Sequence, residues 1–115
     1  MVRLSRPEKR NAIDGKMVEA IRAALDRLPK ETCAVVLHGE GDHFCAGADM
    51  GELAKHSGLD LVRFSRSLYD VLDRIEYGPV PVIAALHGGV IGGGLELAAA
   101  AHIRIAERNT YYEAV

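Results

Sequence analysis

The chain has 115 residues, of which 49% are apolar, and its formal net charge is −2. This length suits one domain at most, and the near-neutral charge gives no reason to expect binding to nucleic acid or to a membrane. No apolar run is long enough to span a membrane, and no signal peptide is evident. The two cysteines lack C-x-x-C spacing, so a cytoplasmic protein with reduced thiols is the simplest interpretation, although a disulfide stays open.

The start of the chain predicts a strand, a polar loop and an amphipathic helix. Val2 to Ser5 are typical of the end of a strand, and a polar loop with a proline follows at residues 6–11. Asp14 is expected to cap the next helix, whose apolar residues recur at three- and four-residue steps until Pro29. Four basic residues lie in or near this loop: Arg3, Arg6, Lys9 and Arg10. Such residues are more commonly solvated, but a cluster of this kind would also suit the binding of phosphates.

The middle of the chain predicts a buried strand followed by a loop that contains glycines. The apolar run from Cys33 to Leu37 is typical of a parallel strand, and residues 38–50 follow it with three glycines. Ligands of α/β proteins commonly bind at the carboxyl ends of strands, so this loop is a candidate binding segment. Within it, Asp49 is expected to cap a helix. His38 and His43 have no third ligand at a useful spacing, so no metal site is expected.

Strands and helices alternate along the rest of the chain, which predicts an α/β fold with a mostly parallel sheet. A long helix is expected from about Leu59 to Glu76, and strands are expected at Val82 to Leu86 and at Ile103 to Ala106. The last two are separated by a helix from Leu95 to Ala101. The long helix has one apolar face, formed by Leu61, Phe64, Leu68, Leu72 and Ile75.

A glycine-rich stretch, residues 87–94, stands between the predicted strand that ends at Leu86 and the helix that begins at Leu95. Glycine lets a ligand approach the backbone, and the first N–H groups of a helix have no internal partner. Such a segment can bind an oxygen that becomes negative during a reaction, and Glu96 would lie close to it. A tight turn with a dipole-compensating glutamate is an equally common interpretation. A nucleotide site is disfavoured, because neither G-x-x-x-x-G-K-[ST] nor G-x-G-x-x-G is present.

Four segments taken together resemble the crotonase, or enoyl-CoA hydratase/isomerase, family: residues 6–12, 41–50, 92–98 and 101–106. They occur in the family's order and at family-like spacing, and the resemblance covers essentially the whole chain. It implies an α/β spiral of ββα units with a mostly parallel sheet. Family domains are much longer, so it also implies that residues 1–115 form a partial acyl-CoA-binding domain, with the C-terminal part absent. We therefore expect apolar surface to be exposed where that part would pack.

The resemblance also implies roles for individual residues. The backbone N–H groups of Ala48 and Gly93 would form an oxyanion hole around the carbonyl of an acyl-CoA thioester, and Glu96 would act as general acid or base. Coenzyme A would lie along the backbone of Ala46, Gly47, Ala48, Asp49, Gly92 and Gly93, with Lys9 near its phosphates. No separate cofactor is implied, because coenzyme A enters as part of the substrate. The complete protein would be a homo-oligomer, either a trimer or a dimer of trimers.

The reaction implied by the resemblance is that of an enoyl-CoA hydratase, a lyase that adds water to an α,β-unsaturated acyl-CoA. The alternatives are an isomerase or acyl-CoA hydrolase of the same family, or a non-catalytic fragment that binds CoA. The second glutamate of the hydratases would fall just beyond Val115. Glu113 lies close to that position but stands where the family commonly has glycine, and His102 stands where many members have aspartate.

Overall fold

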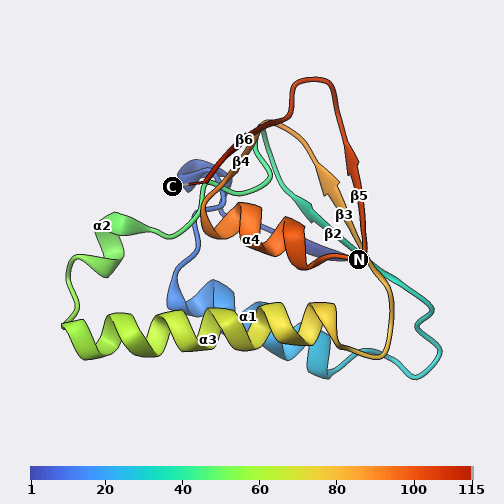
Figure 1. Ribbon diagram of the computed structural model, residues 1–115, viewed down its shortest axis with the longest axis horizontal. Helices are drawn as coiled ribbons and strands as arrows, with labels where there is room; N and C mark the ends of the chain where they lie inside the picture. Colours follow the sequence, from blue (N-terminus) through green and yellow to red (C-terminus); the bar gives the residue numbers. More distant parts are fainter. Residues whose placement is uncertain (115) are drawn as a thin grey trace.

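Two parallel β-sheets organise the computed structural model, which describes residues 1–114 (Figure 1). The larger sheet has the strand order β1-β2-β3-β5, and the smaller sheet pairs β4 with β6. All of these pairs are parallel, as predicted for the α/β class. The strands are Val2–Leu4 (β1), Val35–Gly39 (β2), Val82–Leu86 (β3), Gly89–Ile91 (β4), Ile103–Ala106 (β5) and Tyr111–Glu113 (β6).

The helices begin where local capping chemistry predicts. Asp14 accepts a hydrogen bond from the N–H of Met17 (2.9 Å), and Asp49 accepts one from the N–H of Glu52 (3.1 Å), so both predicted caps are confirmed. Ser57 caps the longest helix in the same way. The helices are the 3-10 helix Pro7–Lys9 (η1) and the α-helices Gly15–Asp26 (α1), Met50–Leu53 (α2), Gly58–Glu76 (α3) and Gly93–Ala100 (α4).

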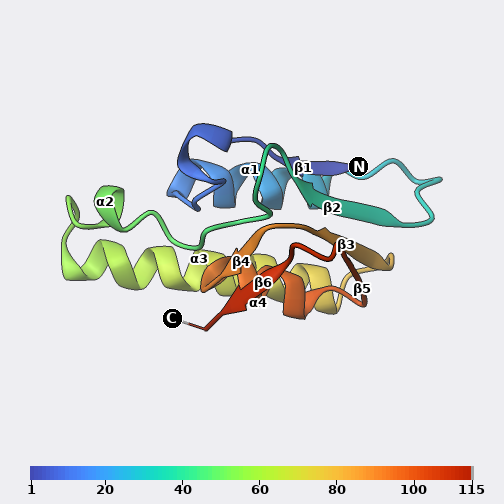
Figure 2. The ribbon, with the colours of Figure 1, turned by 90° about the horizontal axis from the view of Figure 1, so that it is seen from above.

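The chain repeats one path: a strand of the larger sheet, a short strand in a second layer, and a helix. The unit β3-β4-α4 follows this path completely, and β5-β6 follows its first two steps. In the unit before it, β2 is followed by Cys45, which forms a parallel bridge with Val90 of β4. Figure 2 shows the successive turns side by side, from β1 and α1 to β6 and α4. The structure is therefore the predicted spiral of ββα units.

The hydrophobic core lies between one face of the larger sheet and the helices α1, α3 and α4. Alternate residues of β2 and β3 are buried, which is the period of two that a strand imposes. Burial of each large side chain stabilises the fold by about 1.5–3 kcal/mol. The helices contribute Met17, Val18, Ile21, Leu68, Val71, Ile75, Leu97 and Ala98 to this core.

Several predicted boundaries and one predicted face need correction. Strand β2 begins at Val35 rather than at Cys33, which is exposed, and α4 begins at Gly93 rather than at Leu95. The second glycine of this helix packs too closely for a side chain, because a Cβ atom added at Gly94 would lie 2.4 Å from the carbonyl oxygen of Cys45. Leu61 is 40% exposed, because the start of α3 extends beyond α1 and α4 (Figure 1). The predicted loop at residues 6–11 contains η1.

The last two strands carry exposed apolar side chains, as the sequence predicts. The exposed fraction is 52% for Ile103, 64% for Ile105 and 51% for Tyr112. All residues of β5 and β6 are exposed, and these strands form the last turn of the described part of the spiral (Figure 2). An apolar surface of this kind is typical of a surface that packs against further polypeptide.

Membrane-spanning helices and clusters of metal-binding side chains are both absent from the residues that the structure describes. Between residues 1 and 114, none of the helices combines the length and apolar character needed to cross a membrane. Over the same range, no cluster of three or more histidine, cysteine, aspartate or glutamate side chains is placed to hold a metal ion. Among these residues both cysteines are free thiols, with Cys33 exposed and Cys45 buried.

Candidate active site

The second layer brings two segments side by side, residues 45–49 and residues 89–93. The N–H of Cys45 donates to the carbonyl of Gly89 (3.1 Å), and the N–H of Ile91 donates to the carbonyl of Cys45 (3.0 Å). Ala48 lies three residues after Cys45, and Gly93 lies three residues after Val90, the bridge partner of Cys45. The two segments stay adjacent beyond this bridge, because a Cβ atom added at Gly93 would lie 3.8 Å from the backbone nitrogen of Ala48.

Glycine at position 47 allows this close approach. A Cβ atom added there would lie 2.8 Å from the carbonyl oxygen of Ile91 and 3.3 Å from the backbone nitrogen of Gly93, and the φ angle of Gly47 is +88°. A Cβ atom added at Gly93 would in turn lie 3.8 Å from the backbone nitrogen of Ala48. The nitrogens of Ala48 and Gly93 therefore border the same small space.

Both of these N–H groups lack a partner among residues 1–114 and can therefore donate to a ligand. Within residues 1–114, neither the N–H of Ala48 nor that of Gly93 donates to an acceptor of the protein. Gly93 is the first residue of α4, where an N–H has no partner inside the helix and lies at the positive end of the helix dipole. By contrast, the N–H of Gly92 is occupied by the carbonyl of Glu113 (2.8 Å). The site thus offers two donors to an oxygen that carries negative charge.

Glu96 follows Gly93 by three residues on α4. Residues at this spacing are neighbours on a helix surface, so Glu96 lies one turn along α4 from Gly93. Its backbone N–H donates to the carbonyl of Gly92 (3.0 Å), whereas its side chain is exposed. The structure therefore places Gly93 next to Ala48 and puts Glu96 within one helical turn of Gly93.

A third segment, residues 10–13, lies on the other side of residues 45–49. The N–H of Ala46 donates to the carbonyl of Arg10 (3.0 Å), and the N–H of Ile13 donates to that of Gly47 (2.7 Å). The N–H of Asp49 then donates to the carbonyl of Ile13 (2.8 Å). Three chain segments far apart in sequence therefore form one small parallel layer around the site.

Asn11 is a buried residue that the sequence analysis missed. Its side chain has 0% exposure, and its amide nitrogen donates to the carbonyls of Glu40 (2.9 Å), His43 (2.9 Å) and Phe44 (3.2 Å). Its side-chain oxygen accepts from the N–H of Arg6 (2.8 Å). In the sequence it stands in a polar loop and looks like a solvated residue. The residue type was the one available signal, because asparagine is enriched at positive φ. The structure shows a φ of +58° for Asn11.

The cations of the first loop have different roles. The Arg6 guanidinium lies 3.2 Å from the Asp49 carboxylate and 3.4 Å from that of Asp14, so it joins the helix caps of α1 and α2. The N–H of Glu52, with Arg6 and Lys9, holds the pKa of Asp49 below its usual value despite partial desolvation. Lys9 and Arg10 are exposed, as is Arg3 in the neighbouring strand β1. Arg6 is therefore structural, and Lys9 stays a candidate for phosphate contact.

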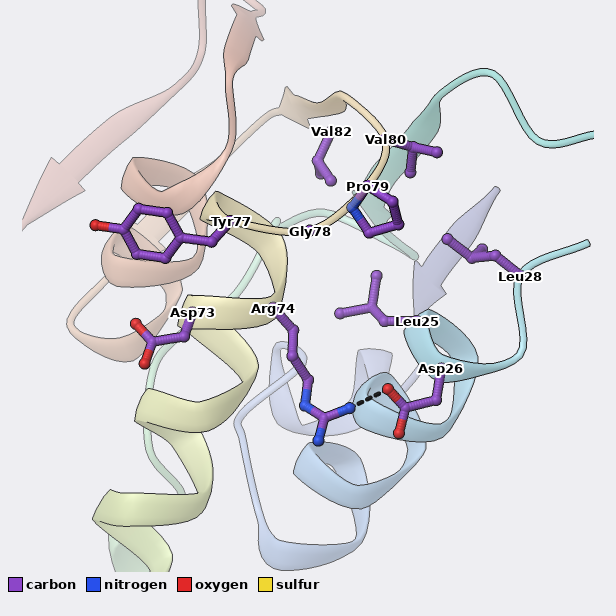
Figure 3. A pocket seen from close by; sticks show the side chains of 10 residues that line it. All are labelled: Leu25, Asp26, Leu28, Asp73, Arg74, Tyr77, Gly78, Pro79, Val80 and Val82. Carbon is purple, nitrogen blue, oxygen red and sulfur yellow. Dashed lines mark hydrogen bonds and ion pairs between the residues drawn. The ribbon is translucent and has the colours of Figure 1, made fainter. Parts of the chain in front are cut away.

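The hollow in Figure 3 lies elsewhere, between the last turns of α1 and α3 and the chain that enters β3. Its volume is about 330 Å³, and Arg74 pairs with Asp26 at its edge. Its floor is formed by apolar residues, Leu25, Leu28, Pro79, Val80 and Val82. None of the residues predicted for the site lines it, so we place the candidate active site at the free donors and not in this hollow.

The buried thiol of Cys45 is expected to make the folded protein less stable as the pH rises through the alkaline range. Burial raises its pKa from 9.0 to about 11, although a hydrogen bond from the backbone of Gly47 opposes this. In the unfolded chain this thiol ionises at lower pH than in the folded protein. The burial of the neutral thiol therefore contributes about 3 kcal/mol to the free energy of unfolding below pH 9, and this contribution is lost as the pH rises toward 11. We expect urea unfolding at pH 8 to 10.5 to show a steeper loss of stability for the wild type than for Cys45→Ala. Equal pH dependence in both would contradict the assignment, and Cys33→Ser is the matched control.

The structure thus defines an α/β spiral in which the N–H groups of Ala48 and Gly93, the latter at the start of a helix, have no acceptor within residues 1–114. Comparison with known proteins agrees with this class. The family model of enoyl-CoA hydratase/isomerase matches residues 1–114. An enoyl-CoA isomerase/hydratase of Mycosarcoma maydis is 37% identical over 113 residues, which cover 90% of this chain. The mitochondrial Delta(3,5)-Delta(2,4)-dienoyl-CoA isomerase of Mus musculus is 37% identical over an alignment of 125 residues, which covers 97% of this chain.

Solved structures give the same result. The enoyl-CoA hydratase of Bacillus anthracis matches with a TM-score of 0.92 and 31% identity, over 96% of this chain and 44% of that one. The enoyl-CoA hydratase of Thermoplasma volcanium GSS1 matches with a TM-score of 0.90 and 39% identity, over 96% of this chain and 46% of that one. The chain belongs to the enoyl-CoA hydratase/isomerase family and has the crotonase fold. It spans 41% of the fungal relative and 38% of the mouse relative.

Proposed function

We propose that this chain carries the oxyanion hole and one acid–base group of an enzyme that acts on enoyl-CoA thioesters, with addition of water as the reaction. The observation that carries the proposal is the pair of N–H groups of Ala48 and Gly93, which have no acceptor within residues 1–114 and border one space at the start of the helix that carries Glu96. Enzymes stabilise developing negative charge with preorganised donors of this kind. Membership in the enoyl-CoA hydratase/isomerase family supports a thioester as the substrate.

Hydration would use these groups as follows. The Glu96 carboxylate takes a proton from water, and the oxygen of that water bonds to the β carbon of the substrate. The electron pair of the double bond moves toward the thioester carbonyl, whose oxygen becomes negative between the N–H groups of Ala48 and Gly93. The enolate then takes a proton at its α carbon from the protonated Glu96, which restores the carboxylate and completes the addition. Positioned proton transfer of this kind typically contributes a ~10²–10⁴-fold rate effect.

Coenzyme A would lie along the backbone of residues 46–49, next to the free donors, with its phosphates near Lys9. Lys9 supports this placement because it is exposed, whereas Arg6 is held by Asp14 and Asp49. We propose no cofactor beyond the CoA of the substrate. A cytoplasmic homo-oligomer is part of the same proposal, and the exposed apolar surface of β5 and β6 supports packing against further polypeptide.

Isomerisation of an enoyl-CoA is the second candidate. The fungal and mouse relatives carry isomerase in their names, and a shift of a double bond passes through the same enolate. The two N–H donors would serve both reactions. The difference lies in whether Glu96 moves a proton to and from water or between two carbons of the substrate.

The absorbance of the conjugated enoyl thioester distinguishes these reactions. With a short-chain 2-enoyl-CoA, hydration lowers the absorbance because it removes the conjugated double bond. With a 3-enoyl-CoA, isomerisation raises it because a conjugated double bond forms. An acyl-CoA hydrolase would instead release free CoA thiol, which a thiol reagent detects. We expect a fall with the 2-enoyl substrate; none of these signals, together with no binding of the thioester, would overturn the proposal.

A further inference from the structure

The position of the Ala48 donor depends on a loop with little regular structure. Residues 40–49 connect β2 to α2 and have only isolated bridges in place of a strand. The other donor, Gly93, is held more firmly because it opens α4 directly after β4. The spacing of the two donors therefore depends mainly on what holds residues 40–49 against the rest of the chain.

Asn11 makes the largest set of contacts with this loop. Its side-chain amide donates to three carbonyls in the turn that leaves β2, those of Glu40, His43 and Phe44. Its own carbonyl accepts from the thiol of Cys45 (3.2 Å), the first residue of the segment that leads to Ala48. Its neighbours Arg10 and Ile13 then pair with Ala46, Gly47 and Asp49. Asn11 is therefore joined both to the turn before the donor segment and to the start of that segment.

The type of residue fits this task closely. A side-chain amide can donate two hydrogens and accept with its oxygen, and all of this capacity is used inside the protein. The backbone φ of +58° is one that asparagine and glycine adopt readily. Aspartate has nearly the same shape but donates no hydrogen bond when ionised, so it would turn a negative charge toward three carbonyl oxygens.

We propose that Asn11 is a positioning residue, which sets the place of the Ala48 N–H relative to the Gly93 N–H. This inference rests on the proposed oxyanion hole. Asn11 itself reaches the reacting atoms only through residues 40–48. A donor displaced by about 1 Å can cost about 100-fold in rate, so loss of the Asn11 amide should lower turnover by about that factor. Affinity for coenzyme A should change little, because the backbone that lines it remains present.

Two variants separate the amide donors from the other properties of Asn11. Asn11→Gly keeps the tolerance for positive φ and removes the side chain, whereas Asn11→Asp keeps the shape and removes the donors. In both variants we expect faster hydrogen exchange at the N–H groups of Ala46 and Asp49 while the amides of α1 and α3 stay protected. We also expect the carbonyl stretch of a bound 2-enoyl-CoA, measured by isotope-edited infrared spectroscopy, to move back toward its value in solution.

Three outcomes would overturn the inference or assign the failure elsewhere. Wild-type exchange and wild-type carbonyl frequency in Asn11→Asp would overturn it. If both variants unfold, hydrogen exchange of the wild type is measured at rising denaturant concentration. The Asn11 side-chain amide and the N–H groups of Ala46 and Asp49 should then become exchangeable at the same denaturant concentration. Exchange of these groups at different concentrations would overturn the inference. A wild-type chain that leaves the carbonyl frequency of the bound thioester unchanged would instead reject the oxyanion hole, while the exchange comparison would still test Asn11.

Discussion

Replacing Gly93 with proline is expected to lower the turnover of an enoyl thioester ~10²–10³-fold, which is the usual effect of removing one oxyanion donor. Proline has no backbone N–H, and the first position of a helix accepts it without loss of a hydrogen bond. Gly93 is at that position in α4, and its N–H has no acceptor within residues 1–114. The substitution therefore removes the proposed donor and preserves the helix, and steady-state kinetics with a 2-enoyl-CoA measures the effect.

Gly93→Ala is the matched control, because it adds a Cβ atom and keeps the N–H. That atom would lie 3.2 Å from the end of the Ile13 side chain, 3.6 Å from that of Leu68 and 3.8 Å from the backbone nitrogen of Ala48, which is an ordinary contact distance. We expect a much smaller loss of turnover in this variant. Equal losses in the two variants would mean that crowding and not the lost N–H causes the effect. An unchanged rate in Gly93→Pro would show that the oxyanion hole lies elsewhere.

Replacing Glu96 with glutamine is expected to lower hydration about 10²–10⁴-fold, because the amide cannot take a proton from water. Glutamine has nearly the same shape and is an equally good helix former, and the side chain at this position is exposed. We therefore expect an unchanged melting temperature and nearly unchanged affinity for the thioester. Stopped assays of turnover and direct titration of binding measure the two effects separately.

Glu113→Gln is the control for the loss of an acid elsewhere in the layer. Glu113 lies on β6, and it contacts the site segment through its backbone carbonyl, which the substitution leaves in place. We expect turnover at the wild-type level. Loss of hydration in Glu113→Gln together with normal turnover in Glu96→Gln would transfer the acid–base role to Glu113.

Much of the fold could be predicted because it rests on local patterns. The apolar run from Val82 to Leu86 became a buried strand with the predicted bounds, and the caps at Asp14 and Asp49 follow from the chemistry of their side chains. The donors could be proposed because a glycine cluster before a helix leaves backbone N–H groups free. The resemblance to a family added Ala48, whose role the pattern of residues 38–50 alone did not identify.

The missed features depend on contacts between distant segments. Strands β4 and β6 have three residues each, which is too short for a period of two to be recognised, and both form through pairing with each other. Asn11 looks like a loop residue until residues 40–44 surround it. The early start of α4 was missed because Gly93 and Gly94 are weak helix formers, whereas tight packing of Gly94 against Cys45 favours glycine at that position.

The carbonyl stretching frequency of an enoyl-CoA bound to this chain tests the central claim most directly. Hydrogen bonds from two backbone N–H groups draw electrons toward the thioester oxygen and weaken the carbonyl bond. We predict that the isotope-edited infrared band moves to lower frequency on binding to the wild type and to Gly93→Ala, and that most of this shift is lost in Gly93→Pro. A bound thioester with the same frequency as in solution would contradict an oxyanion hole formed by Ala48 and Gly93.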